Sequence, residues 1–530
     1  MGDTLVLAGA TVVDGSGRPA FRANVAIADG MISELDETLP LGGKQVIDAD
    51  GLVLAPGFID SHTHTDGAAF KYPLAESKLF QGVTSEVTGN CGIGFFPVAP
   101  RFRGQLEGYL RTHDFAMPPR LDWTDFAGYA EQLGKSGLGV NHVPLVGHGA
   151  LRIAVMGSED RTPTPAEQSS MNDLLAASMQ QGAWGFSTGL IYPPGSFAGI
   201  DELVALARVC AGYGGVYTSH IRGESATLME AVDEAVEIGR QSGARVVISH
   251  LKPIGRANWG KGAALLDKIG QARGAGVDVT ADQYPYEASS TSLATLIPAR
   301  FHAGGADCLL TALADPGRRR DLIEGIEHEL GVRGGAGKVM ITSLASGDAA
   351  GLSGRTLEQI ASMWGSTPAE AAVRLVQDEK GAVGAVYFSI SEQDVDTIMR
   401  SPLVGVGSDG RGLRAEPAGG ATHPRSYGTF PRVLGRYVRE RKLLTLEAAV
   451  HKMTGLTAQR FGLKGRGIIA GGMIADLVLF DPLTIRDVSD FSHPHQYSIG
   501  IEHLFIKGVP VIAAGALTGN AAGRVLLRQP

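Results

Sequence analysis

The strongest constraint on the fold is a repeated alternation of short apolar segments with helical stretches through the middle of the chain. Eight segments have the length and composition of buried strands. In order they are "GFIDSHTH", "GVTSEVTG", "GVNHVPLVGHG", "AWGFSTG", "GVYTSH", "RVVISH", "VDVTADQY" and "LVGVGSD". Helical stretches such as "LMEAVDEAVEIGRQS" lie between several of them. This alternation predicts an α/β fold with a TIM-like (β/α)8 barrel over residues 56–460.

The two ends of the chain have a different pattern. Residues 1–55 and 461–530 contain short alternating runs, such as "TLVLAGATVVDG" and "IEHLFIKGVPVIAAGAL", broken by glycine-containing turns. They predict a small β-sandwich domain built from both termini, a form that domain insertion allows. Residues 286–345 interrupt the barrel pattern with two helical pieces between the seventh and eighth strands. We expect this insertion to form a helical lid over the carboxyl ends of the strands.

Composition excludes several classes of protein. The net charge of −8, without a basic stripe, argues against binding to nucleic acid. No apolar stretch reaches the roughly 18 residues of a membrane span. The 3 cysteines cannot form a disulfide framework, and the N-terminus lacks the basic start of a signal peptide. We therefore expect a cytoplasmic protein.

Residues able to bind metal or move protons stand where several predicted strands end. They are His62, His64, Cys91, His220, His250 and Asp409. The carboxyl ends of barrel strands converge on one site, so these side chains are expected to meet. His62 and His64 are two positions apart, and such residues point to the same side of a strand.

A metal site explains the clustering of these six residues at strand ends better than chance does. A single histidine at a strand end is usually a hydrogen-bonded polar residue, and an isolated His-x-His pair recurs by chance. We keep that plain interpretation for His113, His142, His302, His328, His451, His493, His495 and His503, and we interpret Cys210 and Cys308 as ordinary helix residues. A thiolate together with imidazoles favours zinc over magnesium or calcium.

The motifs also resemble a known family. "PGFIDSHTHTD" and "GMIADLVLFDP" resemble the metal-dependent amidohydrolase superfamily. "TGNCGIGFFPV", "GFSTGLIYPPG", "TSHIRGES", "ISHLK", "DQYPY", "GSDG" and "HPRSYGTFPRVL" resemble the N-acyl-D-amino-acid deacylase (D-aminoacylase) family. With the terminal β segments, the resemblance covers nearly the whole chain.

The resemblance implies how the metal ligands divide. A tight zinc site would use Cys91, His220 and His250, and a second, weaker metal position would use His62, His64 and Asp409. Many relatives in the superfamily bridge two metals with a carbamylated lysine at the end of the fourth strand. This chain has "AWGFSTG" there, without lysine, so the Cys91 thiolate is the expected substitute.

The resemblance further implies the reaction, which is zinc-dependent hydrolysis of N-acyl-D-amino acids to a carboxylate and a free D-amino acid. Asp409 would be the general base and acid, and the α-carboxylate would bind to Lys252, Arg425, Tyr192 and Ser289. We expect His148, at the end of the third strand, near the pocket, without an assigned role.

Other functions stay open at this point. A dipeptidase for peptides with a C-terminal D-residue, or another linear or cyclic amidase, would use the same ligands. A non-catalytic binding protein is disfavoured because such a protein would have lost ligands, and all six are present. Preference for the D-configuration comes from the resemblance alone.

Overall fold

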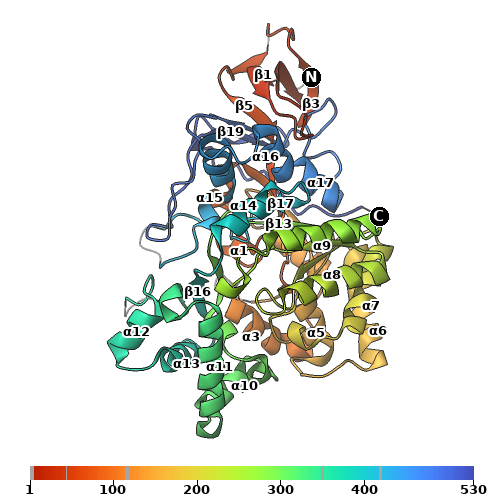
Figure 1. Ribbon diagram of the computed structural model, residues 1–530. Helices are drawn as coiled ribbons and strands as arrows, with labels where there is room; N and C mark the ends of the chain where they lie inside the picture. The colour runs from red at the N-terminus through yellow and green to blue at the C-terminus, as the bar shows by residue number, and fades with distance from the viewer. Residues whose placement is uncertain (1–4, 43, 114–119, 348–350, 417–419, 530) are drawn as a thin grey trace.

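The molecule has three parts, which follow one another in space in the order sheet domain, barrel and long insertion (Figure 1). The computed structural model describes residues 5–42, 44–113, 120–347, 351–416 and 420–529. In the view of Figure 1 the sheet domain stands at the top, the barrel with its helices in the middle, and the insertion at the lower left.

Eight strand positions form the barrel, and they coincide with the eight predicted segments. They are β6 (Phe58–Asp60), β7 (Val83–Thr88), β8 (Asn141–Pro144) with β9 (Val146–Gly147), β10 (Gly185–Gly189), β11 (Val216–His220), β12 (Arg245–Ile248), β13 (Val279–Gln283) and β17 (Val404–Val406). Neighbouring strands pair in parallel. The barrel closes where the Asp409 N–H donates to the His62 carbonyl at 2.8 Å and the His64 N–H to the Gly410 carbonyl at 2.8 Å. The predicted (β/α)8 barrel is confirmed.

Helices cover the outside of the barrel, as their amphipathic patterns predict. Those before the insertion are α1 (Ala68–Lys71), α2 (Glu76–Leu79), α3 (Arg103–His113), α4 (Phe126–Gly134), α5 (His148–Met156), α6 (Pro165–Gln180), α7 (Ile200–Gly212), α8 (Leu228–Ser242) and α9 (Gly262–Gly274). Those after it are α14 (Glu392–Arg400), α15 (Arg425–Arg432), α16 (Leu446–Met453) and α17 (Gly455–Phe461). Helix α6 begins at a reciprocal capping box between Thr164 and Glu167, which satisfies two backbone N–H groups at its start.

Strands from both ends of the chain join in one nine-stranded sheet. From the N-terminal part come β1 (Leu5–Val12), β2 (Phe21–Ala28), β3 (Met31–Asp36), β4 (Gln45–Asp48) and β5 (Val53–Pro56), and from the C-terminal part β18 (Leu477–Phe480), β19 (Ile501–Ile506), β20 (Val509–Ala513) and β21 (Ala516–Leu517). The two parts meet where β5 pairs antiparallel with β18. Buried residues of both parts, including Val25, Leu54 and Phe505, share one apolar core.

The insertion between β13 and β17 is longer and less purely helical than the predicted lid over 286–345. It contains β14 (Ser289–Ser292), α10 (Ala306–Ala314), α11 (Arg319–Val332), β15 (Val339–Leu344), α12 (Leu357–Trp364), α13 (Pro368–Asp378) and β16 (Val383–Tyr387). The strands form a separate antiparallel sheet in the order β14-β16-β15. Leu293, Leu357 and Tyr387 belong to one buried cluster, so the later helices and β16 belong to the same unit.

The last residues of the chain leave the sheet domain and return to the barrel, although the sequence predicts a β domain over 461–530. The His142 N–H donates to the Arg524 carbonyl at 2.9 Å, and the Leu526 N–H donates to the His142 carbonyl at 2.8 Å. The Trp184 indole donates to the Leu526 carbonyl at 2.6 Å. In Figure 1 the C-terminus accordingly lies beside the barrel helices, far from the N-terminus.

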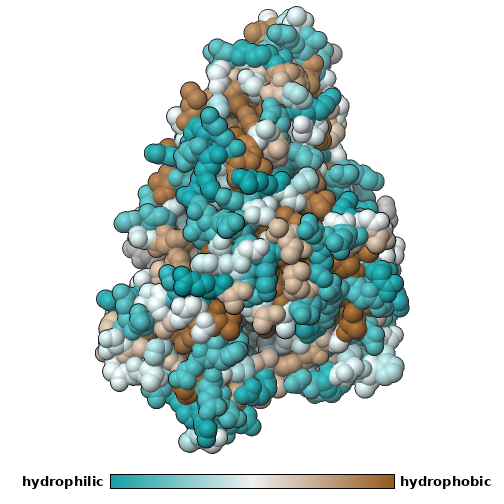
Figure 2. Space-filling view, viewed as in Figure 1, coloured by the Kyte–Doolittle hydropathy of each residue, from teal (hydrophilic) through white to brown (hydrophobic). Residues whose placement is uncertain are grey.

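Among the described residues, no helix combines the length and the apolar character needed to cross a lipid bilayer. On the face shown in Figure 2, hydrophobic residues lie in small groups among hydrophilic ones.

Candidate active site

The predicted ligands lie together at the carboxyl ends of the barrel strands. His62 and His64 follow β6, Cys91 follows β7, His220 ends β11, and His250 follows β12. Asp409 follows β17. The parallel strands of the barrel bring these side chains together from positions as much as about 350 residues apart.

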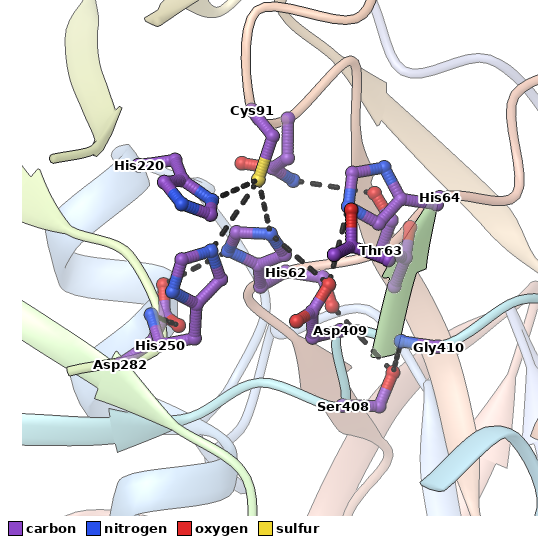
Figure 3. Close-up of polar contacts among 12 residues, drawn as sticks. His62, Thr63, His64, Cys91, His220, His250, Asp282, Ser408, Asp409 and Gly410 are labelled. Carbon is purple, nitrogen blue, oxygen red and sulfur yellow. Dashed lines mark hydrogen bonds and ion pairs between the residues drawn. The ribbon is translucent and has the colours of Figure 1, made fainter. Parts of the chain in front are cut away.

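The Cys91 sulfur stands at the centre of three histidines (Figure 3). Sγ lies 3.4 Å from His62 Nε2, 3.6 Å from His220 Nδ1 and 3.4 Å from His250 Nε2. Figure 3 shows the three rings directed at the sulfur. His62 is therefore as close to the thiol as the two histidines that the resemblance groups with it.

Asp409 lies beside this cluster and contacts both histidines of the His-x-His pair. Its Oδ1 is 3.1 Å from His64 Nε2 and 3.7 Å from His62 Nε2. Its Oδ2 forms an ion pair with Arg425 Nη1 at 2.8 Å. The carboxylate thus has one oxygen toward the histidines and the other toward a guanidinium.

Three of the predicted ligands have an unusual backbone conformation. Cys91, His250 and Asp409 have φ angles of 55°, 38° and 50°, in the left-handed region that residues with a side chain rarely adopt. Each such residue costs about 1–3 kcal/mol and persists only where the surroundings hold it. The surrounding structure therefore holds three of the six predicted ligands in a backbone conformation that these residues disfavour.

The turn that carries Cys91 is held by close backbone packing and by β10. A side chain at Gly89 would place its Cβ 2.1 Å from the Leu145 carbonyl oxygen, so only glycine fits there. The Gly92 N–H donates to Ser187 Oγ at 3.0 Å, and the Ser187 hydroxyl donates to the Gly89 carbonyl. The fourth strand, which lacks a lysine, thus supplies a serine that fixes the cysteine turn on both sides.

Charge within the site favours a thiolate. Burial acts to raise the pKa of Cys91, but the charges of His62 and His250 outweigh it and lower the pKa well below its ordinary value. Burial likewise acts to lower the pKa of His62, yet Asp282 and Cys91 raise it well above its ordinary value. For Asp409, Arg425 and His64 overcome the effect of burial and hold the pKa well below the usual range.

These donors fit a metal cation. His62, Cys91 and His250 offer three ligand atoms within 4.8 Å of one another, as do His62, His64 and Asp409. Sulfur, imidazole and carboxylate are the ligands that zinc takes in proteins, and a thiolate excludes the cations that prefer oxygen. The residues present could hold one zinc ion at the sulfur and a second cation beside Asp409.

Two carboxylates that lie behind the histidines were not predicted. Glu224 Oε1 is 3.1 Å from His250 Nδ1, and its Oε2 is 3.7 Å from His220 Nε2. Asp282 Oδ2 is 3.4 Å from His62 Nδ1, and its Oδ1 accepts a hydrogen bond from the backbone N–H of His250 at 2.7 Å. The position of Asp282 at the end of the seventh predicted strand was the available signal.

A fully buried ion pair lies beneath the site. Lys78 Nζ is 2.7 Å from Asp60 Oδ2 and 2.8 Å from Ser408 Oγ. Asp60 Oδ1 accepts the N–H of Ser408 at 2.8 Å and that of His62 at 3.3 Å. This network joins the segment of His62 to the segment that carries Asp409.

The four predicted substrate-binding residues line a cavity of about 80 Å³, which is also lined by all of the predicted metal ligands except His62. Lys252 Nζ contacts Glu224 and lies 2.9 Å from His250 Nδ1. Arg425 pairs with Asp409 and also donates to the Ser290 carbonyl at 3.1 Å. The Tyr192 hydroxyl lies 3.0 Å from Thr291 Oγ1 on β14, the strand that begins at Ser289.

Two other histidines differ from what the sequence suggests. His148 does not line the described cavities: its Nε2 is 2.7 Å from Glu202, which also pairs with Arg152 at 2.5 Å in a buried network. His113 lines the cavity at the metal ligands and a larger neighbouring one, and its ring centroid is 4.9 Å from that of Tyr192. Burial lowers the pKa of His113 to about 4, so its ring is neutral near pH 7.

Comparison with known proteins identifies the family. The profile of the amidohydrolase family matches residues 45–512. The chain is 38% identical to D-aminoacylase of Alcaligenes xylosoxydans xylosoxydans, over 99% of this chain and 97% of that protein. It is 40% identical to N-acyl-D-glutamate deacylase of the same organism, over 99% of this chain and 96% of that protein.

Solved structures agree over the full length. N-acyl-D-glutamate deacylase from Bordetella bronchiseptica, solved with zinc and a phosphonate inhibitor, matches with a TM-score of 0.83 and 36% identity, covering 99% of each chain. A D-hydantoinase at 16% identity, with a TM-score of 0.56, shares the fold alone. This chain, with Cys91 among its candidate metal ligands, belongs to the amidohydrolase family.

Proposed function

We propose that this protein is a zinc-dependent deacylase that hydrolyses the amide bond of N-acyl-D-amino acids. One observation carries the proposal: the Cys91 sulfur stands 3.4–3.6 Å from three histidine nitrogens beside Asp409. The chain also matches D-aminoacylase and N-acyl-D-glutamate deacylase over nearly its whole length.

Cys91, His220 and His250 would hold the tighter zinc, with His62, His64 and Asp409 at a second, weaker position. A zinc ion there supplies Lewis acidity, which polarises a carbonyl group and lowers the pKa of water. The six donors come from five different strand ends, so the barrel sets their spacing before any ion binds.

Asp409 has the position and charge of the general base. Arg425 holds its pKa well below the usual range, so the carboxylate is ionised near pH 7. Asp409 takes a proton from the attacking water and returns it to the departing amine, which is a poor leaving group without that proton.

The substrate's α-carboxylate would bind to Arg425, Lys252, Tyr192 and Ser289. Arg425 supplies a planar fork of donors that suits a carboxylate, and Lys252 supplies a second positive charge. All four side chains line the cavity of the metal ligands. The substrate is a small molecule, and the cytoplasmic location expected from the sequence stays a prediction.

A substrate panel with metal analysis tests the proposal. We expect the zinc-loaded protein to release amino acid from N-acetyl-D-amino acids and to leave the L-enantiomers and cyclic ureides intact. The Asp409→Asn variant should lose turnover by about a hundredfold or more while still binding zinc at Cys91. Hydrolysis of only cyclic or only L-substrates would overturn the proposal, and near-normal turnover in Asp409→Asn would overturn the role of Asp409.

A further inference from the structure

A larger cavity opens beside the metal ligands. It has a volume of about 660 Å³ and lies between the barrel mouth and the insertion. The smaller cavity at the metal ligands shares part of its wall with it, including Tyr192, Ile254 and Arg333. A substrate whose amide lies at Cys91 and Asp409 would therefore extend past these shared residues into the larger space.

Arg333 is the cationic residue of that shared wall. It follows α11 as the C-cap of the helix, and its side chain is only 12% exposed. The guanidinium carbon lies 4.3 Å from the centroid of the Tyr387 ring, a cation–π contact. The insertion thus places a rigid, permanently charged donor group beside the catalytic cavity.

The guanidinium lacks an adequate anionic partner among the described residues. Its Nε is buried without a hydrogen bond. Its one ion-pair partner is Glu329, at 3.9 Å between Nε and Oε2, which is beyond hydrogen-bond distance. A charged group with little exposure and unfilled donors costs free energy unless an anion is supplied.

Several other cationic residues of these cavities have closer partners than Arg333 has, and Arg411, in the inner cavity, donates to the His113 carbonyl at 2.9 Å. In the inner cavity, Lys252 contacts Glu224, and Arg425 pairs with Asp409 at 2.8 Å. In the outer cavity, Arg222 is bound to Glu234 at 2.9 Å. Arg300 lines only the outer cavity and stacks on its neighbour Phe301.

We propose that Arg333 binds a second carboxylate of the substrate, in addition to the α-carboxylate. The preferred substrates are then N-acyl-D-amino acids with another negative charge, on an acidic side chain or on a dicarboxylic acyl group. Both sources offer the same planar anion to the guanidinium fork. This proposal rests on the proposed deacylase function and names the substrate class within it.

Two pairs of matched substrates test the role of Arg333. N-acetyl-D-glutamate and N-acetyl-D-glutamine differ only in the charge of the side chain, and N-succinyl-D-methionine and N-butyryl-D-methionine differ in the charge of the acyl group. We expect kcat/KM of the zinc-loaded enzyme to favour the charged member of at least one pair by about tenfold to a hundredfold. The pair that shows the preference identifies the source of the carboxylate.

Substitution then assigns the preference to the residue. Arg333→Met should abolish the preference and leave kcat/KM for the neutral member within about twofold, because Met keeps much of the side-chain volume and removes the charge. Arg333→Lys should keep part of the preference, and the control Arg300→Met should keep all of it.

The outcomes separate the two proposals. Two results would overturn the role of Arg333 and leave the deacylase function standing. One is that the neutral member of each pair is hydrolysed as well as the charged member or better. The other is that Arg333→Met lowers kcat/KM equally for the charged and the neutral member of a pair. Failure to hydrolyse any N-acyl-D-amino acid would overturn the deacylase function and, with it, the proposal for Arg333.

Discussion

Glu224 Oε1 lies 3.1 Å from Nδ1 of His250, on the opposite edge of the ring from the nitrogen that faces the Cys91 sulfur. A proton on Nδ1 would be directed at Glu224 and would leave the lone pair of Nε2 free for a metal ion, while Lys252 Nζ, which also contacts Glu224, lies 2.9 Å from the same Nδ1. The other oxygen of Glu224 is 3.7 Å from His220 Nε2, while His220 turns its Nδ1 to the sulfur. One carboxylate therefore lies behind two of the candidate zinc ligands.

Glu224→Gln should weaken zinc binding by about tenfold to a hundredfold, because a carboxylate behind a ligating histidine orients the ring and raises its basicity. Competition with a chelator of known affinity measures the change independently of activity. Glu234→Gln is the matched control, since Glu234 pairs with Arg222 away from the ligands. Equal zinc affinity in the two variants would contradict this role for Glu224.

Cys91→Ala should release the tightly bound zinc. The substitution removes the donor that stands within 3.6 Å of three histidines, and no other cysteine side chain is available there. Metal content after dialysis, measured by elemental analysis, checks the loss. Cys308→Ala serves as the control because Cys308 is exposed on the insertion, and its zinc content should equal that of the parent protein.

Lys78→Met should destabilise the fold by about 3–5 kcal/mol, because it leaves the buried Asp60 carboxylate without its cation. Both side chains are fully buried, and their nitrogen–oxygen distance is 2.7 Å. The urea midpoint of unfolding, measured at constant zinc, reports the change. Lys135→Met breaks an exposed pair with Glu131 and should shift stability by less than about 1 kcal/mol. A similar midpoint for both variants would show that Asp60 does not need Lys78.

Lys452 should make the protein more stable as the pH rises from about 7 toward 10.5. Burial lowers the pKa of Lys452 from 10.5 to about 7 in the folded state. Between these values the unfolded chain binds the proton that the folded protein releases, so the free energy of unfolding increases with pH. Below about pH 7 the full cost of the buried charge is present, and above 10.5 it is absent.

Unfolding midpoints measured between pH 7 and 10 check this dependence. Lys452→Met should flatten the slope, although it also removes the donor to the carbonyls of Ser401 and Val404. Lys464→Met, at an exposed position, should leave the slope unchanged. A slope that survives in Lys452→Met would assign the effect to another group.

The position of the ligands along the chain was predictable because it depends on local pattern. Short apolar segments become barrel strands, and the residue that follows each strand then lies at its carboxyl end. His62, Cys91 and His250 could be assigned to one site from this rule alone. The resemblance added the family and the expected reaction, and comparison with known proteins confirmed the family.

What the sequence could not determine depends on contacts between segments far apart in the chain. The pairing of Arg425 with Asp409, and the place of Glu224 behind two histidines, follow from side-chain directions that no spacing reports. The insertion extends through β16 because its later helices share one apolar core with the earlier ones. The sequence by itself determined the barrel and the positions of the candidate metal ligands, since strand periodicity is local. Only the tertiary structure decided which charges are paired and which, like Arg333, face a cavity, since burial and pairing depend on packing across the whole molecule.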